Sequence, residues 1–242
     1  MIKIENVVLP HEKQWEAVIR GMRNPLNSWD KSDSEECRNI FCGDCDGECL
    51  PYSNGFIIGS NDFDLMKRLD KAGTEHRKFM RMITVYVDIT APLYWWKEFD
   101  TYKVGTVANS CSTMHKIHAK EFELEDFSCE HLGTSLKYPF AQISSLDCLK
   151  VTIKVLNGFR KAYIDYENNP FKEIYDKKDI WWQMIQLLPS SYNQKRTVML
   201  NYEVLANMYH QRNNHKLDEW RTFCGWIKTL PCSELITGEE HE

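Results

Sequence analysis

Four cysteines lie in one short stretch of the chain, and cysteine side chains can hold a metal. They follow the spacing C-x4-C-x2-C-x3-C and are Cys37, Cys42, Cys45 and Cys49, out of nine cysteines in the sequence. Thiolate ligands of this kind favour zinc or an iron–sulfur cluster. Acidic residues at 44, 46 and 48 add negative charge to an already anionic loop. Two interpretations stay open: a structural metal site, or reduced thiols on an acidic loop.

A second group of polar residues lies in the segment 73–118. Its later part contains Asn109, Ser110 and Ser112, together with small residues, after a candidate strand and a candidate helix. Hydroxyl and amide groups at this density suit the binding of a phosphate or a heterocycle. The alternative is an ordinary connecting loop whose hydroxyl groups are satisfied locally.

A third group lies near the C-terminus and consists of Asn201, Asn207 and Arg212. Asn201 and Arg212 are 11 residues apart, so on one continuous helix they return to within about 20° of the same face. Asn207 then points in another direction and meets a different neighbour. The alternative is that all three side chains are simply solvated.

The elements that must position these groups follow from hydrophobic periodicity and from proline and glycine. Residues 78–89 are rich in β-branched and aromatic residues, which predicts a strand. Helical spacing and capping signals predict helices at 11–23, 61–73, 93–102, 145–168, 171–188, 190–212 and 216–230. Residues 24–60 are polar and loop-like. Within the predicted helix at 93–102, the aromatic run from Tyr94 to Phe99 is expected in the core or at a subunit interface.

The composition narrows the class of protein. The chain has 242 residues, of which 43% are hydrophobic, and 35 acidic residues against 30 basic ones give a net charge of −5. This charge argues against duplex nucleic acid as a partner, and no apolar run approaches the roughly 20 residues of a membrane span. We expect a cytoplasmic protein with reduced cysteines. Because no flexible linker divides the chain, residues 1–242 are predicted to form one α+β domain, mostly helical.

The second and third groups together resemble the flavin-dependent thymidylate synthases. The resemblance covers residues 62–226, about two thirds of the chain, and it includes the expected strand. The matching residues are Gly73, Asn109, Ser112, Leu188, Pro189, Asn201, Asn207 and Arg212, the last four of them separated by 12, 6 and 5 residues. What the resemblance implies for the fold is a mostly helical α+β domain with a small central β-sheet.

The sequence departs from the family pattern at several basic positions. The Arg-His-Arg triplet of the family is absent, and its place holds Thr101, Tyr102 and Lys103, or, with a gap of one residue, Tyr102 to Val104. Other departures are Thr74, Ser110, Met114 and Ile185. The basic residues that would compensate for these losses are Lys103, His115, His118, Arg196 and Arg212.

The resemblance implies roles for individual residues. It places Asn201, Asn207 and Lys103 at FAD, and it places a dUMP-like pyrimidine deoxynucleotide at Asn109, Ser110, Ser112, Arg196 and Arg212, with Ser112 and Arg212 as catalytic residues. Methylenetetrahydrofolate and NADPH would be the co-substrates of a C5 methyltransferase that acts as a homotetramer.

Two other functions stay open beside this one. The missing basic residues favour a non-catalytic oligomeric relative that binds nucleotides or acts as a scaffold. The cysteine cluster favours a metal-binding regulatory protein. A further stretch, residues 22–34, is expected either to fold over the substrate site or to form an ordinary surface loop.

Overall fold

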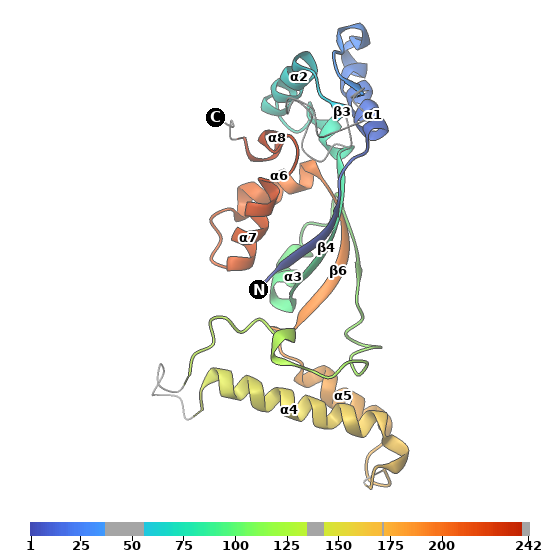
Figure 1. The fold of residues 1–242 in the computed structure, drawn as a ribbon, viewed down its shortest axis with the longest axis vertical. Helices are drawn as coiled ribbons and strands as arrows, with labels where there is room; N and C mark the ends of the chain where they lie inside the picture. Colours follow the sequence, from blue (N-terminus) through green and yellow to red (C-terminus); the bar gives the residue numbers. More distant parts are fainter. Residues whose placement is uncertain (37–55, 135–142, 171, 239–242) are drawn as a thin grey trace, which may run out of the picture. The chain divides into compact units, whose positions relative to one another are not determined.

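The computed structural model describes residues 1–36, 56–134, 143–170 and 172–238. The predicted metal ligands Cys37, Cys42, Cys45 and Cys49 lie outside the described residues. The protein is a mixed α+β structure, as expected (Figure 1). Its helices are α1 (Glu12–Arg23), α2 (Ser60–Lys71), α3 (Leu93–Phe99), α4 (Ser145–Ile164), α5 (Lys177–Leu187), α6 (Tyr202–Arg212), α7 (Asp218–Ile227) and α8 (Glu234–Thr237).

Within the described residues, six strands form two small sheets. They are β1 (Lys3–Val8), β2 (Glu35–Glu36), β3 (Phe56–Ile57), β4 (Thr84–Pro92), β5 (Thr106–Ser110) and β6 (Asn193–Asn201). The larger sheet has the order β1-β4-β6-β5. In the smaller one β2 and β3 pair in antiparallel fashion, with Glu35 opposite Ile57.

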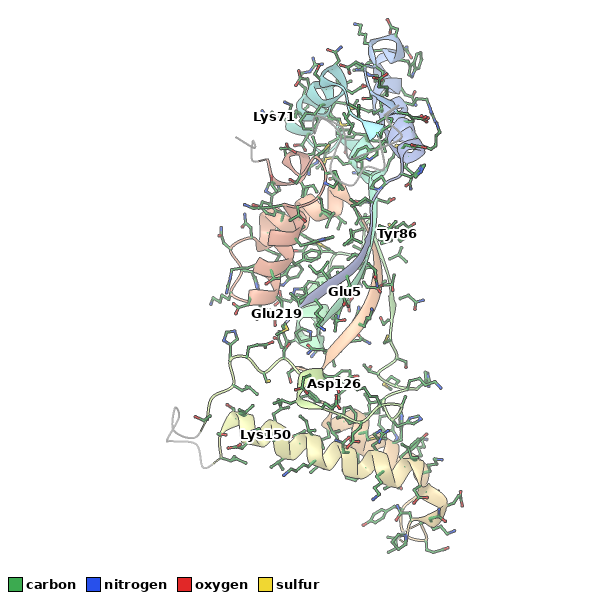
Figure 2. The ribbon with its side chains drawn as sticks, viewed as in Figure 1. Glu5, Lys71, Tyr86, Asp126, Lys150 and Glu219 are labelled. Atoms are coloured by element: carbon green, nitrogen blue, oxygen red, sulfur yellow. The ribbon has the colours of Figure 1, made fainter. Side chains whose placement is uncertain are left out.

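Strand β4 shows why the sequence forms a strand at this place. Val85, Val87 and Ile89 are completely buried or nearly so, whereas Tyr86 between them is 47% exposed. Side chains that alternate between two environments are the signature of a strand, and Figure 2 shows Tyr86 on the extended chain. The expected strand at 78–89 is therefore confirmed from Thr84 onward, while Lys78–Arg81 forms a 3-10 helix.

The predicted helix at 190–212 is wrong in its first half. Residues 193–201 form strand β6, and only residues 202–212 are helical. The β6 residues Val198 and Leu200 are buried, whereas Thr197 is exposed, which again is alternation with a period of two. Because β6 has a strand on each side in the sheet, pairing outweighs the local helix preference.

Four further strands lie in segments that were not expected to be strands: β1, β5, and the short β2 and β3, which fall within the expected loop 24–60. Other element boundaries move as well. The expected helix at 171–188 begins only at Lys177, and the expected helix at 145–168 ends at Ile164, followed by a 3-10 turn at Tyr166–Asn168.

The chain divides into two compact units. One comprises residues 1–3, 90–99 and 109–196, and the other comprises residues 4–89, 100–108 and 197–242. The first is called the α4–α5 unit below, and the second the α6–α8 unit. The expectation that residues 1–242 are a single domain stays a prediction.

The α4–α5 unit has its own core. Helices α4 and α5 pack against each other, as Figure 1 shows. Their buried face joins apolar residues of the preceding loop, and this cluster comprises Ile117, Phe122, Phe127, Leu149, Ile153, Leu156 and Met184. In α3, Trp95, Trp96 and Phe99 are buried with ring centroids 4.9–5.1 Å apart, so in this unit the aromatic run belongs to the core.

The α6–α8 unit is built around α6. Helix α6 packs on α7 and α8, and its first residue, Tyr202, is completely buried. The Tyr202 hydroxyl donates a hydrogen bond to the Pro231 carbonyl, and its amide donates to the Ile83 carbonyl at 3.0 Å. These bonds fix the start of α6, the helix that carries the candidate site residues Asn207 and Arg212. Among the described helices, none is long and apolar enough to cross a membrane.

Candidate functional site

Arg212 lies in the last turn of α6 and is held by aromatic neighbours. Its Nε donates a hydrogen bond of 2.9 Å to the Tyr102 hydroxyl. The guanidinium carbon lies 5.1 Å from the centre of the Trp220 ring and 5.7 Å from that of Tyr102. A cation over aromatic faces keeps its charge while its direction is fixed. Arg212 is therefore an oriented, half-buried cation, as an anionic or carbonyl-bearing ligand requires.

Tyr102 connects this arginine to a second side chain of the same helix turn. The Tyr102 hydroxyl donates to Gln211 Oε1 at 2.9 Å while it accepts from Arg212. A tyrosine hydroxyl has one proton to donate, so both functions of this hydroxyl are used. Tyr102 therefore positions Arg212 by a hydrogen bond and adds no charge of its own.

Asn201 has a structural task that the sequence reasoning missed. It is the N-cap of α6, and its Oδ1 accepts a hydrogen bond of 2.9 Å from the Val204 amide. The expected common face of Asn201 and Arg212 on one continuous helix is thus wrong, because Asn201 precedes the first helical turn. The signal for it was present in the sequence, since asparagine is a preferred N-cap residue.

Gly105 brings the loop after Tyr102 against Asn201. Its φ is +85°, a conformation that side chains disfavour, and a Cβ at this position would lie 2.6 Å from Asn201 Nδ2. Only glycine fits both requirements. The loop 102–105 therefore contacts the two ends of α6, through Tyr102 at Arg212 and through Gly105 at Asn201.

Lys103 and Asn207 belong to the same unit and are exposed. Lys103 lies in this loop, between the two contacts, and Asn207 lies in the middle of α6. Within the described part of the chain, neither side chain has a hydrogen-bond or ion-pair partner. Both are thus available to an external ligand.

In the α4–α5 unit, Gln194 organises a second group. This residue is buried, and its Nε2 donates to the Cys111 carbonyl at 2.7 Å. Its Oε1 accepts from Arg196 Nε at 3.0 Å. The Arg196 guanidinium carbon also lies 4.2 Å from the centre of the Trp96 ring. Gln194 was not among the expected site residues, and its period-two spacing from Arg196 would have indicated a shared strand face.

The expected nucleotide residues of β5 lie in this second group. Asn109 and Ser110 are exposed, and the amide of Cys111, the next residue, donates to the Lys195 carbonyl at 2.9 Å. Ser112 is exposed as well. Its Oγ accepts hydrogen bonds from the amides of His115 and Met114, at 2.9 and 3.2 Å, so its own proton remains to be donated.

The thiol groups near these sites differ in reactivity. Burial raises the pKa of Cys224 to about 11 and outweighs the opposite effect of the positive charges of Arg212 and Lys228. The Cys224 thiol therefore stays protonated at neutral pH, whereas Cys111 is exposed. Among the described residues, no group of three or more His, Cys, Asp or Glu side chains is arranged to hold a metal ion.

The fold of this protein is similar to that of the flavin-dependent thymidylate synthases. Two crystal structures of thymidylate synthase X (ThyX) from Helicobacter pylori with FAD and dUMP have a TM-score of 0.58 at 14% and 13% sequence identity. The similarity covers 98% of this chain and 96% or 97% of theirs.

A third solved structure is the UMP/dUMP methylase PolB from Streptomyces cacaoi, bound with 5-Br dUMP. It has a TM-score of 0.52 at 14% identity, and the match covers 98% of this chain and 95% of PolB. No family profile and no curated protein matches the sequence. At such identities the likeness concerns the fold, and the residues of this chain must carry any statement on function.

Proposed function

We propose that this protein binds FAD and a dUMP-like pyrimidine deoxynucleotide, and that it transfers a one-carbon unit from methylenetetrahydrofolate to C5 of the base. NADPH would reduce the flavin. The observation that supports this most strongly is the oriented cation Arg212, fixed by Tyr102 and Trp220 in a fold shared with enzymes crystallised with FAD and dUMP. We further propose a homotetramer located in the cytoplasm.

The available donors fit an anionic flavin. Lys103 and Asn207 are exposed, and the Asn201 amide nitrogen is held in place because its oxygen caps α6. One ammonium and two amide groups suit a diphosphate and the polar edge of a flavin ring. In this proposal the three residues bind and orient FAD, which when bound supplies hydride for the reduction of the transferred carbon.

The residues proposed to bind the nucleotide form two groups, one in each unit. In the α6–α8 unit, Arg212 would bind the pyrimidine and stabilise negative charge that develops on it. In the α4–α5 unit, Arg196 would pair with the phosphate, while Asn109, Ser110 and Ser112 donate hydrogen bonds. Ser112 and Arg212 are the proposed catalytic residues.

Binding is the first test of this proposal. We expect purified protein that has been incubated with FAD and desalted to keep a flavin absorbance spectrum, and we expect dUMP to raise its melting temperature. The Arg212→Gln variant should lose the shift caused by dUMP. The Arg221→Gln variant is the matched control, because Arg221 is an exposed arginine of the same unit that pairs with Asp218.

Two outcomes contradict the proposal. A colourless protein whose melting temperature responds to neither ligand would exclude a flavin nucleotide enzyme. An equal loss in the Arg221→Gln and Arg212→Gln variants would show that any loss of charge weakens binding. Nucleotide binding without reduction of the flavin by NADPH would instead favour the non-catalytic relative.

A further inference from the structure

A basic cavity lies beside α2, apart from the residues proposed above to bind flavin and nucleotide. Its volume is about 560 Å³, within the usual range for a small-molecule site. Helix α2 contributes Lys67, Arg68 and Lys71, of which Lys71 lies four and three residues after the other two, and Lys31 also lines the cavity. Figure 2 shows Lys71 at the end of α2. All of these residues belong to the α6–α8 unit.

One of the lining residues, Arg23, belongs to a buried ion pair with Asp62. The Arg23 side chain is 4% exposed and the Asp62 side chain 0%, and Arg23 Nε donates to Asp62 Oδ1 at 2.5 Å. The other Asp62 oxygen accepts hydrogen bonds from the hydroxyls of Ser32 and Ser34, at 2.7 and 2.6 Å. Burial alone would raise the pKa of Asp62, but these hydroxyl hydrogen bonds, followed by Arg23, lower it below its usual value. The carboxylate therefore stays ionised and neutralises Arg23.

The same ion pair places Lys31 at the cavity. Arg23 Nη2 donates to the Lys31 carbonyl at 3.0 Å, and Arg23 Nη1 donates to the Ser28 carbonyl at 3.2 Å. The short turn Trp29–Lys31 is thus fixed against the first turn of α2 by buried hydrogen bonds. Lys31 is held there by the backbone, and its exposed side chain adds its charge to those on α2.

Positive charge exceeds negative charge around this cavity. Asp64 is the one carboxylate among the lining residues that the structure describes, and it pairs with Lys67 at 3.1 Å. Lys31 and Arg68 have no carboxylate within ion-pair distance in the described part of the chain. A concentration of cations in a concave site of a chain with net charge −5 attracts anions locally.

We propose that this cavity is a second anion site, which binds the phosphate chain of a small di- or triphosphate. The described lining residues include no aromatic side chain on which a base could stack, and this favours recognition of the phosphates alone. The proposal does not depend on the flavin and nucleotide binding proposed above, since none of the residues involved is shared.

The test is a calorimetric titration of the full chain with inorganic triphosphate. We expect one molecule to bind per chain, more weakly as salt is added. The Lys31→Gln/Arg68→Gln variant should bind at least about tenfold more weakly, because two charge-assisted contacts are lost. The matched control is the Lys150→Gln/Lys161→Gln variant, which removes two exposed lysines from α4 and should bind like the unchanged chain.

Four further results would each overturn the proposal or part of it. Equal loss of binding in both double variants, or no binding to the unchanged chain, would overturn the proposal. So would a loss of FAD binding in the Lys31→Gln/Arg68→Gln variant, because the cavity would then belong to the flavin site. A deoxynucleoside triphosphate should bind about as tightly as inorganic triphosphate. Much tighter binding would overturn recognition of the phosphate chain alone.

Discussion

At the scale of single residues, Tyr102 orients a cation without adding charge. Its hydroxyl accepts a hydrogen bond from Arg212 and donates one to Gln211. The direction of the Arg212 guanidinium is thus fixed. The affinity of the protein for a nucleotide should depend on the tyrosine hydroxyl even though this hydroxyl carries no charge.

The Tyr102→Phe variant tests this dependence. It keeps the ring under the guanidinium and removes the acceptor of a hydrogen bond from a charged group, typically about 1.5–3 kcal/mol. Because Arg212 is partly exposed, we expect the lower end, about a tenfold rise in the Kd for dUMP by calorimetry. The melting temperature of the free protein should hardly change. An unchanged Kd would show that Tyr102 does not position Arg212 for binding.

Gly105 is the second residue whose identity the structure explains. The Gly105→Ala variant puts a Cβ at positive φ and against the Asn201 amide, and we expect a loss of roughly 1–3 kcal/mol in the free energy of unfolding. The Gly158→Ala variant is the control, because a Cβ there meets nothing within 4 Å in helix α4. It should stabilise the chain by about 0.5–1 kcal/mol. Equal effects in urea denaturation would contradict the strained conformation of Gly105.

At the scale of elements, the junction of β6 and α6 shows what sequence reasoning can and cannot reach. The spacing of Asn201, Asn207 and Arg212 indicated candidate site residues, which stay a prediction, whereas the local sequence wrongly favoured one helix from 190 to 212. The strand exists because β6 pairs on both sides in the sheet, and such partners cannot be seen from a local window. By contrast, the sequence predicted β4 because the alternation of its buried and exposed side chains is local and strong.

The residues that no local pattern revealed are those that act through distant partners. Gln194 acquires its role from Cys111, which lies 83 residues away in the sequence, and Tyr102 acquires its role from Arg212, 110 residues away. The residues proposed to bind ligands could be predicted because asparagine, serine and arginine side chains suit the binding of phosphates and bases. The residues that orient them could not be predicted, since their role arises only when the sheet and α6 bring distant parts of the chain together.

Two substitutions at Asn201 separate its role as the N-cap of α6 from its proposed role in FAD binding. Asn201→Ala removes the cap of α6 and should cost about 1 kcal/mol of stability in urea denaturation. Asn201→Asp keeps the cap, because aspartate is equally good there, but it removes the amide donor and adds negative charge. We therefore expect Asn201→Asp to fold normally and to bind FAD more weakly. Normal FAD binding by the Asn201→Asp variant would remove this residue from the flavin site.

Asp62 connects the segment 28–34 to α2, and its titration makes the free energy of unfolding depend on pH. Its pKa is lowered in the folded state, so its stabilising effect is complete above the ordinary pKa of about 3.9 and is lost as the pH falls through the lower folded value. Asp62→Asn leaves Arg23 buried without its partner and should cost roughly 3–5 kcal/mol at neutral pH. This deficit relative to the unchanged chain should shrink in strongly acidic solution.

The Asp64→Asn variant is the control for this prediction. Asp64 lies on the same helix, but its side chain is 66% exposed, and its pair with Lys67 is a surface ion pair. Such pairs contribute about 0–1 kcal/mol. Urea denaturation at several pH values compares the two variants. An equal and small loss in both would contradict the stabilising role of the buried pair.

At the scale of the whole molecule, the protein combines a known fold with a small number of oriented cations. Its fold matches enzymes crystallised with FAD and dUMP at 13–14% identity. Two candidate site cations are oriented by aromatic rings, Arg212 by Tyr102 and Trp220, and Arg196 by Trp96 together with the buried Gln194. We propose that these oriented cations suffice for binding and that the chain is catalytically competent.

The most direct measurement is the mass of the nucleotide after reaction. Purified protein is incubated with dUMP, FAD, NADPH and methylenetetrahydrofolate, with the Arg212→Gln variant as the comparison. We predict that the unchanged protein converts dUMP to a product heavier by one CH2 unit, as methylation at C5 requires. The Arg212→Gln variant should do so far more slowly. Unchanged dUMP in a protein that binds both flavin and nucleotide would contradict catalysis and leave a binding protein with the fold of the enzyme.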